Sequence, residues 1–304
     1  MPDNTPFVID KNLGQNMVPQ PGDLSGTNAD GVATIPLTQE QKYIFDTRGW
    51  LLVPGVLSQT EIAEMREFAL RVKHDPESLP EHQRSYIAGP LQKLTDHPVV
   101  LGFMNEFLSV THLNSQDGYG FRMESGSIRY RSVKTGEVGD FKPHNGNGFL
   151  RFAVDSHHYQ CIPGKAYSGL TRVVWELNPV QKGKGGTLVV TGSHKSVYEA
   201  PEAVQDKDSP LWDTYACPAG SVLFFTEAIT HSATPWTDQQ HDRVAIFNLY
   251  NAVGSKWGTW EPHPELLAEM PPKRQSLFRD VHVSNNRMGS EGYHGGNLEQ
   301  VRKT

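Results

Sequence analysis

Between residues 38 and 75, the spacing of apolar residues predicts two helices separated by a short strand. Thr38 followed by Gln41 is typical of a capped helix start, and Gly49 is a suitable stop before an apolar strand at Trp50–Val53. A second helix is expected after Ser58, where apolar residues recur at intervals of three and four. These residues are Ile62, Met65, Phe68, Ala69 and Val72. The spacing gives this helix one apolar face, which we expect to pack against a sheet.

From about residue 118 onward, the pattern changes to short strands separated by Gly and Pro. Four segments rich in Val, Phe, Leu and Trp, most of them bounded by turn residues, are predicted strands: 172–177, 186–190, 221–226 and 244–251. Many short strands of this kind predict a sandwich or barrel. Residues 260–279, which include two adjacent prolines, are expected to form a terminal helix and loop laid over the barrel.

Length and composition favour a single enzyme domain with irregular ends. The chain has 304 residues, of which 37% are hydrophobic, and this is enough to bury a substantial core. Residues 1–36 mix Pro, Gly, Asn and Asp with few apolar residues, which predicts an irregular N-terminal arm. We therefore expect one domain over residues 37–284 and a C-terminal tail over residues 285–304.

Charge and cysteine usage exclude several classes of partner. With 28 basic and 34 acidic residues the net charge is −6, so the chain lacks the excess of basic residues that is typical of nucleic-acid binding. No targeting segment or apolar run of membrane-spanning length is present. Cys161 and Cys217 lie far apart, which argues against a zinc knuckle or a disulfide framework. We predict a cytoplasmic protein whose partners are small molecules, with no nucleic acid and no membrane.

The candidate chemistry lies in two histidines and one arginine. His144 opens the sequence His-Asn-Gly, strand-like segments separate it from His231, and Arg243 follows twelve residues after His231 on the next predicted strand. A lone histidine is more often a surface or hydrogen-bonded core residue, and the chain has 13 of them. Their shared context raises His144 and His231 above the others. We leave out the adjacent His157 and His158, because neighbouring residues on a strand point to opposite faces.

The order of these residues resembles the phytanoyl-CoA dioxygenase family of Fe(II)- and 2-oxoglutarate-dependent oxygenases. The same order includes the run Gly-Gly-Thr-Leu-Val-Val-Thr-Gly-Ser-His at 185–194 and the run Pro-Ala-Gly-Ser-Val-Leu-Phe-Phe at 218–225. Phe45 and the segments 49–53 and 55–57 also resemble the opening helix, strand and turn of the family. The resemblance covers roughly residues 38–280. It implies a mainly β fold, a double-stranded β-helix (jelly-roll, cupin-like) barrel with N-terminal and C-terminal helical additions.

The resemblance also implies a set of site residues. Oxygenases of this kind hold Fe(II) with two histidines and one carboxylate, so His144 and His231 are the expected metal ligands. Arg243 is expected to bind the far carboxylate of 2-oxoglutarate with its guanidinium fork. Asn145 and Ser232 are weaker candidates for binding the same cosubstrate. Dioxygen and a small-molecule substrate would complete the reaction, with hydroxylation of a C–H bond as the default.

The position two residues after His144, where the family normally has the carboxylate ligand, is Gly146. In the related radical halogenases this residue is Gly or Ala, and chloride occupies the space. Three alternatives stay open. An acid from elsewhere, for example Asp140 or Asp155, restores a hydroxylase; chloride fills the place and the enzyme halogenates; or the protein is a non-catalytic cupin-like module that binds a small anionic metabolite. Gly146 is also explained by a turn, because Asn147-Gly148 follows it.

The substrate pocket is predicted from polar and aromatic residues on the strands near the histidines. The candidates are Arg122, Arg129, Tyr130, Arg131, Arg151, Arg172, Trp175 and Trp236. Several arginines in one region can bind a carboxylate or phosphate, although an exposed strand face decorated with Arg is the commoner explanation. The substrate itself is not indicated by any motif, and nothing marks a coenzyme A or fatty acyl site.

Overall fold

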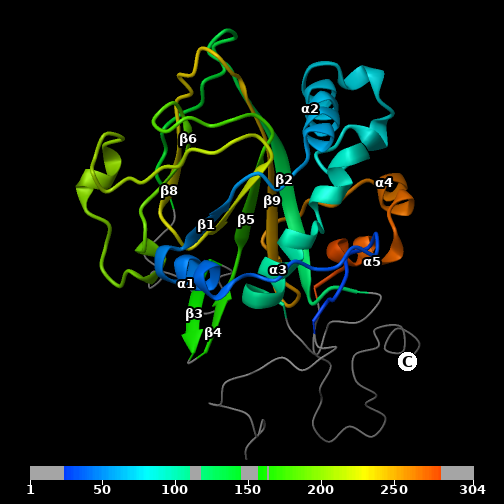
Figure 1. The fold of residues 1–304 in the computed structure, drawn as a ribbon, viewed down its shortest axis with the longest axis horizontal. Coiled ribbons are helices and arrows are strands. Elements are labelled where there is room, and N and C mark those ends of the chain that lie inside the picture. Colours follow the sequence, from blue (N-terminus) through cyan, green and yellow to red (C-terminus); the bar gives the residue numbers. More distant parts are fainter. Residues whose placement is uncertain (1–23, 110–117, 145–156, 163, 282–304) are drawn as a thin grey trace, which may run out of the picture.

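Two antiparallel sheets lie against each other, and most of the helices cover the outer face of the larger one (Figure 1). The structure, a computed structural model, describes residues 24–109, 118–144, 157–162 and 164–281. The larger sheet has the strand order β1-β7-β5-β9-β2, and the smaller sheet pairs β6 with β8. A separate hairpin pairs β3 with β4. The strands are β1 (Trp50–Val53), β2 (Phe121–Arg131), β3 (Tyr159–Ile162), β4 (Lys165–Ser168), β5 (Thr171–Glu176), β6 (Gly186–Val189), β7 (Ser221–Thr226), β8 (His231–Thr234) and β9 (Arg243–Ala252).

The helices precede, interrupt and follow these strands. The α-helices are α1 (Gln39–Arg48), α2 (Gln59–His74), α3 (Pro98–Phe107), α4 (Pro264–Glu269) and α5 (Pro272–Gln275). Short 3₁₀ turns are η1 (Pro76–Ser78), η2 (Glu81–Gln83), η3 (Gly89–Leu94), η6 (Ser193–Lys195), η7 (Glu202–Gln205) and η8 (Ser276–Phe278). Short helices therefore do occupy most of the segment 260–279, as predicted. None of the helices in the described ranges is long and apolar enough to cross a membrane.

The start of the domain follows the local signals in the sequence. The Thr38 hydroxyl accepts a hydrogen bond from the Gln41 backbone, and the Gln41 side chain accepts one from the Thr38 backbone, so the predicted capping box is confirmed. Gly49 ends α1 with φ of 79°. A Cβ atom at this position would lie 2.5 Å from Nδ1 of His194, so only glycine lets this histidine approach. The strand at Trp50–Val53 begins immediately after it, as predicted.

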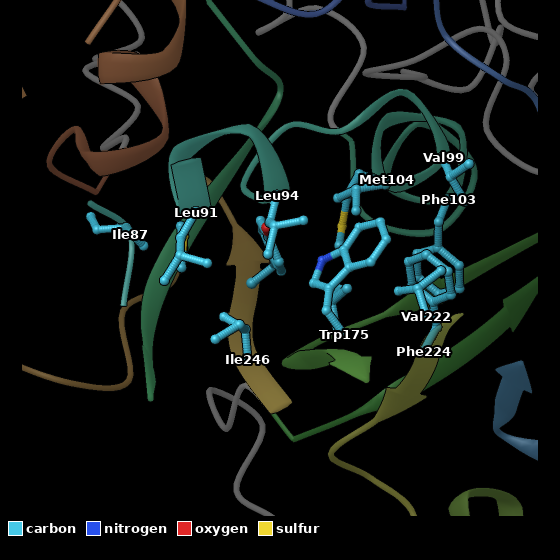
Figure 2. Packing of buried hydrophobic residues seen from close by; sticks show 14 of the residues in the cluster. Ile87, Leu91, Leu94, Val99, Phe103, Met104, Trp175, Val222, Phe224 and Ile246 are labelled. Carbon is cyan, nitrogen blue, oxygen red and sulfur yellow. The ribbon is translucent and has the colours of Figure 1, made fainter. Parts of the chain in front are cut away.

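The larger sheet has a different neighbour on each face. On the outer face, Trp175, Phe224 and Ile246 pack with α3 and the η3 segment, as Figure 2 shows. The rings of Phe224 and Phe103 stack with centroids 4.4 Å apart. On the inner face, a second apolar cluster joins this sheet to the smaller one and to the loops around it. Its members include Val174, Leu223, Phe225, Ala245, Val189 and Trp236.

Side chains along a strand point alternately to the two faces of the sheet, and this corrects one prediction. We expected Trp175 to line the substrate pocket together with Arg172, but the two residues are three positions apart on β5 and therefore point to opposite faces. Trp175 is fully buried on the helix side, where its ring lies 5.1 Å from the ring of His97. It belongs to the structural core and not to the pocket.

Helix α3 is the main element that the sequence patterns did not predict. Nine of its ten residues are buried, so it lacks the broad polar face that marks a surface helix. Its start does carry a local signal, since the His97 side chain accepts a hydrogen bond from the Val99 backbone and Pro98 occupies the first turn. Residues of the N-terminal segment also contact it: the Asn105 amide donates to the Ser25 carbonyl.

Candidate metal centre

His144 and His231 face each other because their backbones pair. The His144 amide donates to the His231 carbonyl at 3.1 Å, and the His231 amide donates to the His144 carbonyl at 3.0 Å. Two residues that exchange both hydrogen bonds across an antiparallel pair carry their side chains on the same face. The two imidazole rings accordingly lie with centroids 4.2 Å apart. Strand pairing thus brings together the two histidines that the sequence analysis selected.

Each of these imidazoles is oriented by a backbone carbonyl. Nδ1 of His144 lies 2.8 Å from the Lys142 carbonyl, and Nδ1 of His231 lies 3.0 Å from the Ile229 carbonyl. A carbonyl can only accept a hydrogen bond, so Nδ1 carries the proton in both rings, and a neutral ring then presents a lone pair at Nε2. A carbonyl behind Nδ1 is the usual support of a metal-binding histidine. The two residues therefore fit a metal bound through Nε2.

A buried carboxylate lies beside His231. Oε2 of Glu227 is 3.5 Å from Nε2 of His231, while Oε1 of Glu227 accepts hydrogen bonds from Nε and Nη2 of Arg172 at 2.9 and 2.7 Å. Burial opposes ionisation of Glu227, but the charges of His231 and Arg172 outweigh it and hold the pKa of Glu227 at about 2. Burial lowers the pKa of His231 to about 4, against the opposing effect of Glu227. At neutral pH the pair is an anionic carboxylate beside a neutral imidazole.

Arg243 forms a second buried ion pair on the same face of the sheet. Its Nε and Nη2 atoms donate to the Glu176 carboxylate at 3.2 and 2.5 Å, and Nη2 also donates to the Tyr215 hydroxyl. Burial opposes the charge on Arg243, yet the ion pair with Glu176 keeps the pKa of Arg243 above its ordinary value. Because Glu176 takes the Nε–Nη2 edge and Nη2 also donates to Tyr215, both protons of Nη2 are engaged, and a ligand carboxylate would bind at Nη1.

A cavity of about 290 Å³ opens between the two sheets next to the histidines. Its lining includes His144, His231, Arg129, Arg131, Arg172, Arg243, Trp236 and Phe247. Within the described ranges, Arg172 and Arg243 pair with carboxylates, whereas no ion pair is formed by Arg129 or Arg131. Burial and the charges of the other three arginines lower the pKa of Arg129. The cavity is therefore cationic.

The structure places the other predicted site residues in three groups. Arg129, Arg131, Arg172 and Trp236 line the cavity, as does Ser232, whose hydroxyl accepts a hydrogen bond from the Lys142 backbone. Arg122 does not, because it pairs with Glu124 near the other end of β2 and contacts the Arg279 carbonyl. That prediction was wrong, because position along the strand decides which residues reach the cavity. Asn145, Gly146, Arg151 and Asp155 lie outside the described residues.

The sequence patterns did not indicate Glu227, Glu176 and Tyr215, which contact cavity-lining residues from behind. The weak signal for Glu227 was an acid inside an otherwise apolar run that ends at His231. Asp140, one of the acids we considered as a metal ligand, lines the cavity but is exposed and pairs with Lys142. In the described part of the chain, no three His, Cys, Asp or Glu side chains already form a complete metal cluster.

Buried histidines make the stability of the metal-free protein depend on pH. Burial lowers the pKa of His97, His194 and His231 to about 4, whereas an unfolded histidine titrates near 6.5. Between these values the unfolded chain binds protons that the folded chain does not, so the free energy of unfolding falls as the pH falls. Each histidine contributes up to about 1.4 kcal/mol per pH unit. Urea unfolding at pH 7, 6 and 5 measures this slope. His194→Gln should reduce it by about one proton, and an unchanged slope would contradict the assignment.

The chain is similar to a known protein family and to several solved structures. Residues 45–245 match the family described as phytanoyl-CoA dioxygenase. No curated protein matches the chain. HygX from Streptomyces hygroscopicus with iron bound is 21% identical, with a TM-score of 0.55 over 74% of this chain and 90% of HygX.

Two further solved structures are similar in fold. HygX with nickel, 2-oxoglutarate and hygromycin B bound is 22% identical, with a TM-score of 0.54 over 76% of this chain and 94% of that one. EctD from S. alaskensis in its apoform is 16% identical, with a TM-score of 0.54 over 87% of this chain and 93% of EctD. The mainly β, jelly-roll fold predicted from the sequence is thereby confirmed.

Proposed function

The chain belongs to the phytanoyl-CoA dioxygenase family, and on this premise we propose that it is an Fe(II)- and 2-oxoglutarate-dependent oxidoreductase. The reaction would use dioxygen to activate a C–H bond of a small-molecule substrate, with hydroxylation as the default outcome. The observation that carries the proposal is the pairing of His144 with His231, which presents two supported Nε2 atoms beside a cationic cavity. HygX, which has the same fold, holds iron in one structure and nickel with 2-oxoglutarate in another, and this supports the same cofactors here.

Each residue around the cavity has a defined task in this proposal. Iron with 2-oxoglutarate, when bound, supplies oxidising power that amino-acid side chains lack. His144 and His231 would hold the metal through Nε2. Arg243 would hold the distal carboxylate of 2-oxoglutarate through Nη1, with charge-assisted hydrogen bonds. An apolar wall formed by the buried Trp236 and by Phe247 would limit the access of water to the reacting groups.

The charges of the cavity suit an anionic cosubstrate. Glu227 and Glu176 neutralise Arg172 and Arg243, which leaves the charges of Arg129 and Arg131 on β2. These two residues lie two positions apart and therefore project from the same face of the strand. Their field attracts a dianion such as 2-oxoglutarate into the cavity.

Gly146 favours a second candidate reaction, in which chloride is transferred to the substrate. A glycine at this position contributes no charge and leaves space for an anion, as in the radical halogenases that the sequence resembles. The third alternative, a non-catalytic module for an anionic metabolite, is favoured by the arginines of the cavity. It gives no reason for two histidines whose Nδ1 atoms are both held by carbonyls.

Anaerobic addition of Fe(II) and 2-oxoglutarate, followed by visible absorption with and without chloride, tests the proposal. We expect a metal-to-ligand charge-transfer band, because a chelated 2-oxo acid on Fe(II) absorbs visible light. A band that is indifferent to chloride supports hydroxylation, and a band that shifts with chloride supports halogenation. The absence of a band under both conditions would remove the iron-enzyme assignment and leave the binding module.

A further inference from the structure

The carboxylate of Glu227 lies beside the nitrogen atom through which His231 would bind a metal. Nδ1 of His231 donates to the Ile229 carbonyl, so a neutral imidazole directs its Nε2 lone pair toward Oε2 of Glu227, 3.5 Å away. Two ligand atoms that are each about 2.1 Å from one metal ion lie roughly 3.0–3.4 Å apart for angles between a right angle and the tetrahedral angle. The observed separation is close to this range.

We infer that Glu227 supplies the carboxylate ligand of the metal, in place of the acid that is absent at Gly146. The inference rests on the proposed function, because it assumes that His144 and His231 bind Fe(II). It assigns the third protein ligand to the turn between β7 and β8, four residues before His231. The usual position two residues after His144 then needs no side chain.

The surroundings of Glu227 hold one carboxylate oxygen toward the metal position. Arg172 binds Oε1 through two nitrogen atoms, and this fixes the plane of the carboxylate while Oε2 faces His231. The Glu227 backbone amide donates to the Leu170 carbonyl at 2.8 Å, which anchors the turn to the residue just before β5. The side chain is 5% exposed, so water competes little for it. Hydrogen bonds that orient a ligating carboxylate are a regular part of metal sites.

His231 and Glu227 form the fixed part of this site, and His144 forms the adjustable part. The first two residues are buried, whereas His144 is exposed and its ring is restrained mainly by the Lys142 carbonyl. The described residues do not yet form a three-residue cluster, so the inference requires the exposed His144 ring to turn toward Glu227 when the metal binds. Asp140 is a poorer candidate, because it is exposed and held by Lys142.

The assignment predicts how the metal site responds to chloride. When Glu227 is a ligand, its carboxylate fills the position that chloride would take, so the wild-type charge-transfer band should not change with chloride. Removing the carboxylate opens that position. We therefore compare the wild type with Glu227→Gln, which keeps an acceptor for Arg172, and Glu227→Ala, which leaves space.

Ni(II) binding in the presence of 2-oxoglutarate, measured by calorimetry, provides a readout that does not depend on turnover. We expect both variants to lose about 10- to 100-fold in Ni(II) affinity. Glu227→Ala should also acquire a chloride-sensitive Fe(II) band. Adding Gly146→Asp to Glu227→Ala should restore affinity and chloride indifference, because a carboxylate returns from the usual position. A purely structural role of Glu227 predicts no such rescue.

Glu124→Gln is the matched control, since Glu124 is a buried carboxylate paired with Arg122 near the other end of β2. It should leave Ni(II) affinity unchanged, and thermal melting of every variant reports its folding. Wild-type Ni(II) affinity and chloride indifference in both Glu227 variants would overturn the ligand assignment while leaving the proposed function intact. A wild-type protein that binds neither Ni(II) nor Fe(II) would overturn the proposed function, and this assignment with it.

Discussion

Replacing His231 with alanine is expected to abolish metal binding and, with it, the formation of succinate from 2-oxoglutarate. The substitution removes a proposed ligand and leaves Glu227 without the imidazole beside it. Loss of a residue that only supports a ligand already costs about 10- to 100-fold in metal affinity, so loss of the ligand itself should exceed about 100-fold. Calorimetry with Ni(II) and a succinate assay with Fe(II) measure the two effects.

The control for this variant is another buried histidine outside the cavity. Nε2 of His194 contacts the Asp46 carbonyl, and its ring packs beside Gly49. His194→Gln should keep the Ni(II) affinity of the wild type, whatever its effect on stability. Unchanged succinate production by His231→Ala would remove His231 from the ligand set and, with it, the central assumption of the proposed function.

Replacing Arg243 with methionine should destabilise the protein strongly, apart from any effect on 2-oxoglutarate. Glu176 is fully buried, and its carboxylate depends on Arg243 for charge compensation. Removing one partner of a buried ion pair typically costs about 3–5 kcal/mol, because the other charge stays buried. Urea unfolding of the metal-free protein measures this loss.

A second substitution separates the two roles of Arg243. The double variant Arg243→Met/Glu176→Gln leaves no uncompensated charge, so most of the lost stability should return. Its affinity for 2-oxoglutarate should stay low, because the guanidinium that would bind the distal carboxylate is still absent. Recovery of 2-oxoglutarate binding in the double variant would show that Arg243 does not bind the cosubstrate. A single variant as stable as the wild type would contradict the ion-pair argument.

Elements with local signals were predictable from the sequence. The capping box at Thr38, the stop at Gly49 and the strand Trp50–Val53 depend on neighbouring residues, and the structure agrees with each. Four further strands were placed within one residue of their observed ends, because turn residues mark most of their limits. Helix α3 was missed, since a helix buried on nearly all sides has no polar face to reveal its period.

The site was predictable only in part, because much of it depends on strand register. His144 and His231 could be selected from their order in the chain, but their backbone pairing could not. Glu176 and Glu227 enter the site through contacts with Arg243 and Arg172, which lie 67 and 55 residues away in sequence. No local pattern indicates such contacts. The wrong prediction that Trp175 lines the pocket has the same origin. The face of the sheet to which a side chain points matters as much as the position of the residue in the chain.

The two-sided packing of the larger sheet separates the requirements for stability from those for ligand choice. Along β5 and β9, alternate residues belong either to the helix-packed core of Figure 2 or to the side that holds the cavity. Substitutions on the two sides share few contacts, so their energetic effects should be close to additive. A variant library restricted to positions such as Ser127 and Phe247, on the cavity side of β2 and β9, can therefore explore new substrates while the folding core keeps its sequence.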